Sequence, residues 1–360
     1  MARAVYIHIP FCKSICSYCD FCKFLYNEKW VYVYLDALKK EIQDRYLDDP
    51  VSSIYIGGGT PSALSSSELT KLFKIIEIFK RSDDIEITFE CNIDDITQDL
   101  LSILKINGVN RLSIGIQSFK ENNLLFLNRN IVSFKEAQEK INLCRINGFN
   151  NINIDLMYAL PAQTLKDLEI DLALFLKLKV EHISTYSLMI EKNTKLSVDN
   201  TSYIDEELDY DMFKKIEKKL KDYNHYEVSN YAKPGYESRH NLTYWNNQEY
   251  YGFGLSASGY IDGIRYDNTK NLKKYLLEDW IKESQILSLK ETMDYEIILG
   301  LRKLQGINKE EFLKKFNTSI YEAYNINSLI SNKDLIDRDG YIFINPIKLY
   351  VMNEILLKII

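Results

Sequence analysis

The feature that most constrains this fold is a strand–helix rhythm that repeats through the first half of the chain. Short apolar runs with strand character alternate with longer segments whose apolar residues recur at helical spacing. The expected strands lie at 4–11, 51–56, 85–90, 111–117, 151–157 and 182–188, and the expected helices at 30–45, 67–79, 97–107, 134–147 and 165–178. Six strands at intervals of roughly 30 residues, each followed by a helix or a loop, predict a parallel sheet.

Polar residues help to decide between the two architectures that fit this rhythm, a doubly wound sheet and a barrel. Cys12, Gly57–Thr60, Glu90, Gln117 and Asp155 fall at or just after the carboxyl ends of successive expected strands. Barrel sites are assembled at that face from several strand ends at once. Because six strands close only part of a barrel, we expect an α/β fold with a partial (β/α)6 TIM-like barrel.

Three cysteines follow the first expected strand at the spacing Cys12-x-x-x-Cys16-x-x-Cys19. A [4Fe–4S] cluster normally takes four cysteines, so three ligands leave one iron free for an exchangeable molecule. Zinc sites usually combine two cysteine pairs, or one pair with histidines, and a disulfide framework needs an oxidising compartment. Neither alternative has support nearby, so the spacing predicts an iron–sulfur cluster. Cys22 is ambiguous, as a fourth ligand, a reactive thiol or a packed residue.

The cysteine loop and the strand before it carry a family resemblance. The string Tyr6-Ile-His-Ile-Pro-Phe-Cys12-x-x-x-Cys16-x-Tyr18-Cys19-Asp-Phe resembles the radical S-adenosylmethionine (SAM) enzymes. Within them, the chain is similar to the branch that holds oxygen-independent coproporphyrinogen III dehydrogenase and a haem-chaperone relative. The resemblance implies a three-quarter barrel and a [4Fe–4S] cluster on Cys12, Cys16 and Cys19, with SAM as the second cofactor.

A SAM-binding shell follows from the same resemblance. The turn from Gly57 to Pro61 is similar to the family's contact with the methionine amino group, although a tight strand-to-helix turn has the same composition. Polar residues at strand ends suit the ribose hydroxyls and the carboxylate of SAM, although each one singly is also an ordinary loop residue. The residues expected to bind SAM are Tyr6, Tyr18, Gly58, Gly59, Thr60, Glu90, Gln117, Arg129, Asp155 and Met189.

A histidine motif in the second half separates the two branches. His240-Asn-Leu-Thr-Tyr244-Trp245 lies in an expected loop and resembles the signature of the haem-chaperone branch. Imidazole is a common ligand of haem iron, so His240 is the expected haem-binding residue. The alternative is that His240 and Trp245 tie a second domain to the open side of the barrel.

The expected function follows from this branch. The resemblance implies a haem chaperone that binds haem, SAM and the cluster, receives electrons from a donor, and transfers haem to an acceptor protein. The first alternative is an oxygen-independent coproporphyrinogen III oxidase that makes protoporphyrinogen IX. A third is a radical SAM protein with another substrate.

Composition sets the expected surroundings. The net charge of −6 provides no basic face for nucleic acid. No apolar run approaches the ~20 residues of a membrane span, and the first four residues contain no apolar stretch that predicts a secretory signal. With six cysteines, four of them clustered near the start, we expect a soluble cytoplasmic protein with no nucleic-acid partner and no membrane span.

Three parts are expected along the chain. Residues 1–200 form the radical SAM partial barrel, 201–270 a covering segment with the histidine loop, and 271–360 a helical, winged-helix-like module. The covering segment contains an expected helix at 205–223 and an expected strand at 226–231. Helices are expected to fill most of 270–330, followed by a short strand at 341–344 and a last helix.

Overall fold

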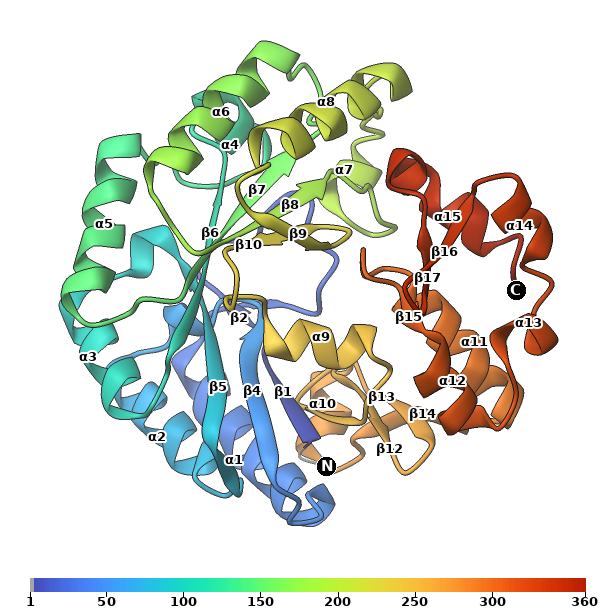
Figure 1. Cartoon of the computed structure of the whole chain (residues 1–360). Coiled ribbons are helices and arrows are strands. Elements are labelled where there is room, and N and C mark those ends of the chain that lie inside the picture. The colour runs from blue at the N-terminus through green and yellow to red at the C-terminus, as the bar shows by residue number, and fades with distance from the viewer. Residues whose placement is uncertain (1–2) are drawn as a thin grey trace.

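Six parallel strands form the centre of the fold (Figure 1). The computed structural model describes residues 3–360. Met1 and Ala2 are part of the segment in which no secretory signal is expected, and they lie outside the described residues. The strands, in sheet order, are β1 (Arg3–Ile9), β4 (Val51–Gly58), β5 (Arg81–Asn92), β6 (Arg111–Gln117), β7 (Ile152–Tyr158) and β8 (His182–Ser187). Each pairs in parallel with the next. This is the expected α/β fold with a partial barrel.

Helices connect these strands and cover the outside of the sheet (Figure 1). They are α1 (Glu28–Arg45), α2 (Ser66–Ile76), α3 (Gln98–Ile106), α4 (Glu121–Phe126), α5 (Phe134–Ile146) and α6 (Leu165–Lys177). The starts of α2, α5 and α6 are fixed by capping boxes, in which a Ser or Thr and an acidic residue three positions later satisfy each other's backbone N–H groups. The predicted helices are all present, and α4 is an addition.

Short strands extend the sheet at both edges, to twelve strands among the described residues. On one side β11 (Tyr250–Phe253) pairs in parallel with β1, and β12 (Ser258–Ile261), β13 (Ile264–Asn268) and β14 (Ile281–Ile286) continue antiparallel. On the other side β10 (Asn230–Ala232) and β9 (Asn224–Glu227) follow β8. The covering segment therefore shares one sheet with the barrel.

Two local expectations for this segment are wrong. The single strand expected at 226–231 is the hairpin of β9 and β10, because the Glu227 carboxylate accepts hydrogen bonds from Ser229 and Asn230 and turns the chain back. The loop expected around His240 is the helix α9 (Arg239–Trp245). Ser238 caps its start, and the Glu86 carboxylate on β5 accepts from the backbone N–H groups of Arg239 and His240.

The last part of the chain is a separate lobe beside the barrel (Figure 1). It contains α11 (Leu289–Gly300), α12 (Lys309–Phe316), α13 (Ile320–Ala323), α14 (Asn327–Ser331) and α15 (Met352–Leu356). A small antiparallel sheet has the order β15 (Ile307–Asn308), β17 (Tyr341–Ile344), β16 (Leu335–Arg338). This part of the chain thus combines helices with a small three-stranded sheet. Its winged-helix-like character and its boundaries stay predictions. Before this lobe, the chain also forms the helix α8 (Glu206–Lys219) and the short helices α7 (Lys195–Val198) and α10 (Leu272–Leu276).

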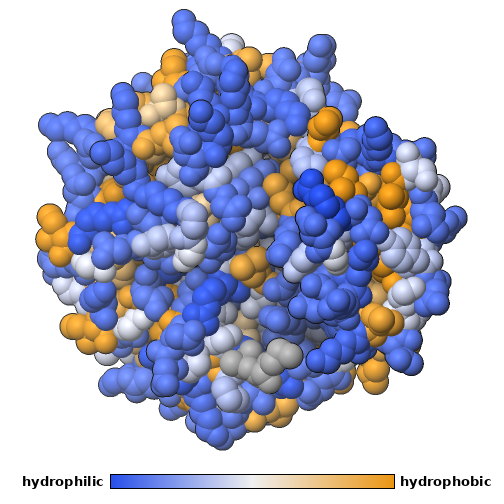
Figure 2. Space-filling view, in the orientation of Figure 1, coloured by the Kyte–Doolittle hydropathy of each residue, from blue (hydrophilic) through white to orange (hydrophobic). Residues whose placement is uncertain are grey.

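The core runs from the barrel into this lobe as one apolar cluster. On the face shown in Figure 2, hydrophilic residues predominate and hydrophobic ones form small separate areas. Across residues 3–360, no helix combines the length and the apolar character needed to cross a bilayer.

Candidate functional site

The cysteine loop leaves the carboxyl end of β1 and is anchored to the segment after α4. The loop begins at β2 (Phe11–Cys12), which pairs with β3 (Phe24–Leu25). Ser17 donates its backbone N–H to the Leu127 carbonyl at 3.1 Å, and Asn128 donates to the Ile15 carbonyl at 2.7 Å. These bonds hold the three cysteines over the end of the barrel at which β1 has its carboxyl end.

The three cysteines have the chemistry of cluster ligands. Cys12 is buried, Cys16 and Cys19 are half-buried, and all three are free of disulfides. Burial raises the pKa of the Cys12 thiol to about 11, and a hydrogen bond from Thr60 opposes the shift. In residues 3–360, no three His, Cys, Asp or Glu side chains gather around one metal-ion position. A cluster binds each thiolate through a different iron, so its ligands are spread more widely than around a single ion.

The glycine turn after β4 lies beside this loop. Gly59 and Thr60 donate their backbone N–H groups to the carbonyls of Ile9 and Phe11, each at 2.9 Å. Gly58 has φ +112°, and a Cβ there would meet the His8 ring at 2.5 Å. A Cβ on Gly57 would meet the Glu90 carboxylate at 2.7 Å. At Gly58 the backbone conformation therefore requires a glycine, whether or not a ligand approaches it.

Two carboxylates face the interior of the barrel. Glu90 accepts from the Tyr55 hydroxyl at 2.8 Å and the Gly58 backbone N–H at 3.0 Å. Its pKa is raised to about 7, mainly by burial and further by the charge of Asp155. Asp155 accepts from Asn153 at 2.8 Å, and burial raises its pKa. Asp155 lies in the middle of β7 rather than at its end, so it reaches the site from inside the barrel.

Arg129 and Gln117 lie between these carboxylates and the cysteine loop. Arg129 donates to the Asn92 side chain at 3.0 Å, to the Gly115 carbonyl at 2.8 Å and to the Cys16 sulfur at 3.7 Å. Gln117 has φ +72°, a strained value for a residue with a side chain. Its Oε1 atom is buried and accepts no hydrogen bond from the described residues. A strained residue with an unused acceptor is suited to binding a hydroxyl-bearing ligand.

One cavity of about 470 Å³ brings most of the predicted residues together. The predicted residues that line it are Cys12, Cys16, Tyr18, Cys19, Gly58, Gly59, Thr60, Glu90, Gln117, Arg129, Asp155 and Met189. Further polar residues that the sequence did not predict also line the cavity, among them Tyr55, Asn92, Arg111, Ser113, Asn153, Ser184 and Tyr186. The signal that could have found most of them is the period of two along the strands, since polar residues at alternate positions of an otherwise apolar strand face inward together.

Two predicted residues lie outside the cavity lining. Tyr6 is in β1 and bonds to the His8 ring at 3.0 Å. His240 is 1% exposed, with one ring nitrogen 3.0 Å from the Ser53 hydroxyl and the other 2.8 Å from the Tyr244 hydroxyl. Burial lowers the pKa of His240 to about 3, so the ring is neutral. Its neighbour Asn241, by contrast, reaches the cavity.

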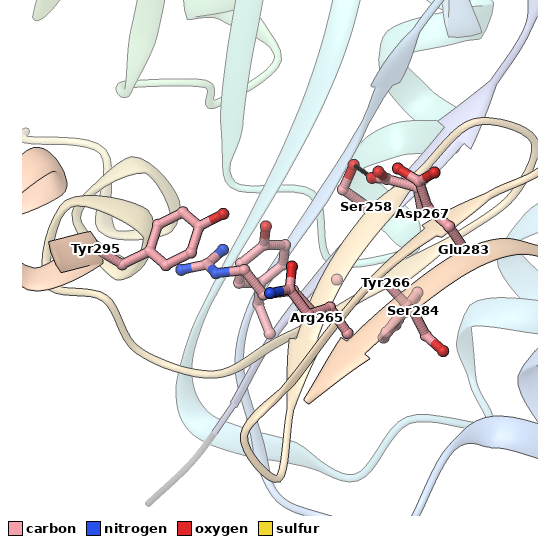
Figure 3. A pocket seen from close by; sticks show the side chains of 10 residues that line it. Ser258, Arg265, Tyr266, Asp267, Glu283, Ser284 and Tyr295 are labelled. Atoms are coloured by element: carbon pink, nitrogen blue, oxygen red, sulfur yellow. Dashed lines mark hydrogen bonds between the residues drawn. The ribbon is translucent and has the colours of Figure 1, made fainter. Parts of the chain in front are cut away.

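A second hollow, of about 650 Å³, lies between β11–β14 and α11 (Figure 3). The Arg265 guanidinium lies against the ring of Tyr295, 3.8 Å from its centre. It also lies 4.5 Å from the centre of the Tyr260 ring and donates to Asn247 at 2.8 Å. None of the predicted site residues lines this hollow. The barrel cavity is therefore the candidate site.

A cysteine loop over the carboxyl face of a partial barrel, with an inward-facing polar shell, defines a radical SAM protein. The model of the Radical SAM superfamily matches residues 6–175. More particularly, the chain belongs to the HemW family. It is 39% identical to the heme chaperone HemW of Lactococcus lactis, with 92% of this chain and 90% of that protein covered. It is also 39% identical to the heme chaperone HemW of Bacillus subtilis, with 88% of each covered.

The fold is also similar to a solved structure, coproporphyrinogen III oxidase (HemN) from Escherichia coli, described as a radical SAM enzyme. The TM-score is 0.86 at 22% identity, over 99% of this chain and 90% of that one. At this identity, the likeness is evidence for the fold alone. Membership of the radical SAM superfamily implies a [4Fe–4S] cluster and SAM as cofactors. The residues present fit both: the free thiols can bind the cluster irons, and the buried carboxylates, the Gln117 amide and Arg129 can hydrogen-bond to SAM.

Proposed function

We propose that this protein is a haem chaperone, which binds haem beside a SAM-liganded [4Fe–4S] cluster and transfers it to an acceptor protein. The observation that carries the proposal is the barrel cavity, in which the three cysteines and the polar shell meet. The relatives with the name heme chaperone HemW, similar over most of the chain, supply the class of cargo. An electron donor for the cluster and a cytoplasmic location complete the proposal.

We assign the cofactors to residues of this cavity and to Tyr6, which lies outside its lining. Cys12, Cys16 and Cys19 hold the cluster, and the residues assigned to SAM are Tyr6, Tyr18, Gly58, Gly59, Thr60, Glu90, Gln117, Arg129, Asp155 and Met189. When bound, the cluster and SAM supply reductive cleavage of a carbon–sulfur bond. The protein's part is to orient SAM: carboxylates and the Gln117 amide accept from hydroxyl groups, and the Arg129 guanidinium bonds to a carboxylate while remaining tied to β6.

His240 is our candidate for the haem-iron ligand, through a rearrangement of α9. Its two ring nitrogens bond to Ser53 and Tyr244, so coordination requires the ring to exchange one of these partners for iron. Its low pKa supports this role, because only a neutral imidazole nitrogen coordinates a metal. The four histidines of the chain all make hydrogen bonds within the protein, and His240 is the one in the motif of the chaperone branch.

The fold likeness to coproporphyrinogen III oxidase supports a second candidate, oxidative decarboxylation of coproporphyrinogen III to protoporphyrinogen IX. One experiment separates the two. The chain is reconstituted anaerobically with iron and sulfide, then given haem and SAM in one arm and coproporphyrinogen III and SAM with a reductant in the other. A chaperone binds haem, so the Soret absorbance of the complex should saturate at one equivalent of haem per chain. It should release no decarboxylated porphyrin. If the chain instead converts coproporphyrinogen III to protoporphyrinogen IX and binds no haem, the protein is the oxidase and not the chaperone.

A further inference from the structure

A buried arginine inside the barrel has no hydrogen-bond or ion-pair partner among residues 3–360. Arg111 is the first residue of β6 and is 2% exposed, yet it lines the cavity. Within residues 3–360, its side chain makes no hydrogen bond, and no carboxylate lies within 4 Å of it; its Nε is fully buried. A guanidinium stays charged under all protein conditions. An unpaired buried charge costs several kcal/mol, so such a group calls for an anion.

The nearby carboxylates are committed to other donors. Glu90 accepts from Tyr55 and Gly58, and Asp155 accepts from Asn153. Glu86, on the same face of β5, accepts from the first two backbone N–H groups of α9. The positive charge also reaches the adjacent histidines: together with burial, Arg111 lowers the pKa values of His182 and His240, which stay neutral. The charge of Arg111 also opposes the rise that burial causes in the pKa values of Glu90 and Asp155, but neither carboxylate forms a direct ion pair with it.

The other arginines of the two hollows are different. Arg129 bonds to Asn92 and Gly115, and Arg265 lies against two tyrosine rings and donates to Asn247. Gly115, to which Arg129 is tied, is four residues along β6 from Arg111, which is roughly 13 Å. The two side chains therefore start from different points along the barrel, although the charges of both lower the pKa of Asp155. If Arg129 takes the carboxylate of SAM, Arg111 remains available for a second one.

We propose that Arg111 binds a carboxylate of the molecule that shares the barrel cavity with SAM. A guanidinium and a carboxylate form two parallel hydrogen bonds, which fix the orientation as well as the position of the ligand. The buried Ser113, Asn153 and Ser184 line the same part of the cavity and supply further hydrogen-bonding groups. Under the proposed function, the carboxylate is a propionate of the tetrapyrrole. This identification of the ligand rests on the proposed function.

The test compares Arg111→Gln with wild type in the reconstituted full chain. The probes are haem, haem dimethyl ester, which lacks free propionates, and SAM. We expect wild type to bind haem about 10- to 100-fold more tightly than the ester, the range of one charge-assisted pair. Arg111→Gln should bind both equally, with SAM affinity unchanged. The control Arg265→Gln should retain the wild-type preference, because Arg265 has partners of its own.

Other outcomes of this experiment show which molecule supplies the carboxylate that Arg111 binds. A loss confined to SAM would assign the carboxylate to SAM and overturn the propionate source, and unchanged affinity for all three probes would overturn the proposal. Without ligands, Arg111→Gln should melt no lower than wild type, since it removes an unpaired charge; a clearly lower melting temperature would show that the charge has a structural partner. If wild type binds no haem, the proposed function fails, and coproporphyrin III with its tetramethyl ester tests Arg111 in its place.

Discussion

Replacing Glu90 by Gln should change how stability depends on pH. Glu90 is deep in the protein, and its remaining exposure is to the cavity. Burial raises its pKa from 4.5 to about 7, and the negative charge of Asp155 adds to the shift. Gln has nearly the same shape and can still accept from Tyr55 or Gly58. The substitution therefore removes the titration with little change in packing.

The direction and size of this change in stability follow from the pKa of Glu90 in the unfolded chain and in the folded protein. Between pH 4.5 and about 7, folded Glu90 keeps a proton that unfolded Glu90 has lost. The stability that this group contributes is fully present below pH 4.5 and is lost as the pH rises through about 7. A shift of this size corresponds to about 3 kcal/mol as an upper figure, since contact with the cavity reduces the effect.

Urea unfolding of the cofactor-free chain at a series of pH values measures this effect. Between about pH 4 and pH 8, the free energy of unfolding of Glu90→Gln should gain up to about 3 kcal/mol relative to wild type. The control Glu139→Gln, at an exposed position of α5, should follow the wild-type profile. A difference between Glu90→Gln and wild type that is the same at every pH would refute the argument that burial holds the proton on Glu90.

Three further substitutions test the proposed cofactor residues. Cys16→Ala should abolish the iron–sulfur absorbance of the reconstituted chain and Cys22→Ala should leave it; the reverse pattern would disprove the ligand assignment. Asp155→Ala or Arg129→Ala should weaken SAM binding in equilibrium dialysis by about 1.5–3 kcal/mol with the cluster intact, and unchanged affinity would remove these residues from the site. His240→Ala should shift or erase the Soret band of the haem complex while sparing the cluster spectrum. A less stable variant with an unaltered haem spectrum would mean that His240 serves only to hold α9 in place.

The sequence predicted the barrel because its signals are local and repeated. Apolar strands and capped helices alternate at regular intervals, and Glu90 and Gln117 stand out as polar residues near strand ends. Arg111 was missed because a charged residue at the start of a strand usually faces solvent, and only the tertiary structure shows that this one faces inward. The resemblance, rather than periodicity, supplied Arg129, which lies in a loop.

The second half was harder to predict, because its structure depends on distant partners. All six residues of β14 are exposed, so the strand has no alternation of burial that its sequence could reveal. Helix α9 is short and rich in aromatic residues and asparagine, and its start is satisfied by Glu86, more than 150 positions away. Local propensity does not encode such long-range contacts.

The pairing of β1 with β11 has a consequence for synthesis of the chain. The strand that carries the cysteine loop is an early product of translation, yet one of its two neighbours lies at residues 250–253. At about 5–20 residues per second, β1 waits roughly 12–50 s on the ribosome for that partner. During this interval its free edge is a template for pairing with other chains. Insertion of the cluster before β11 arrives would therefore take place on an incompletely paired barrel, and chains truncated before residue 250 should aggregate.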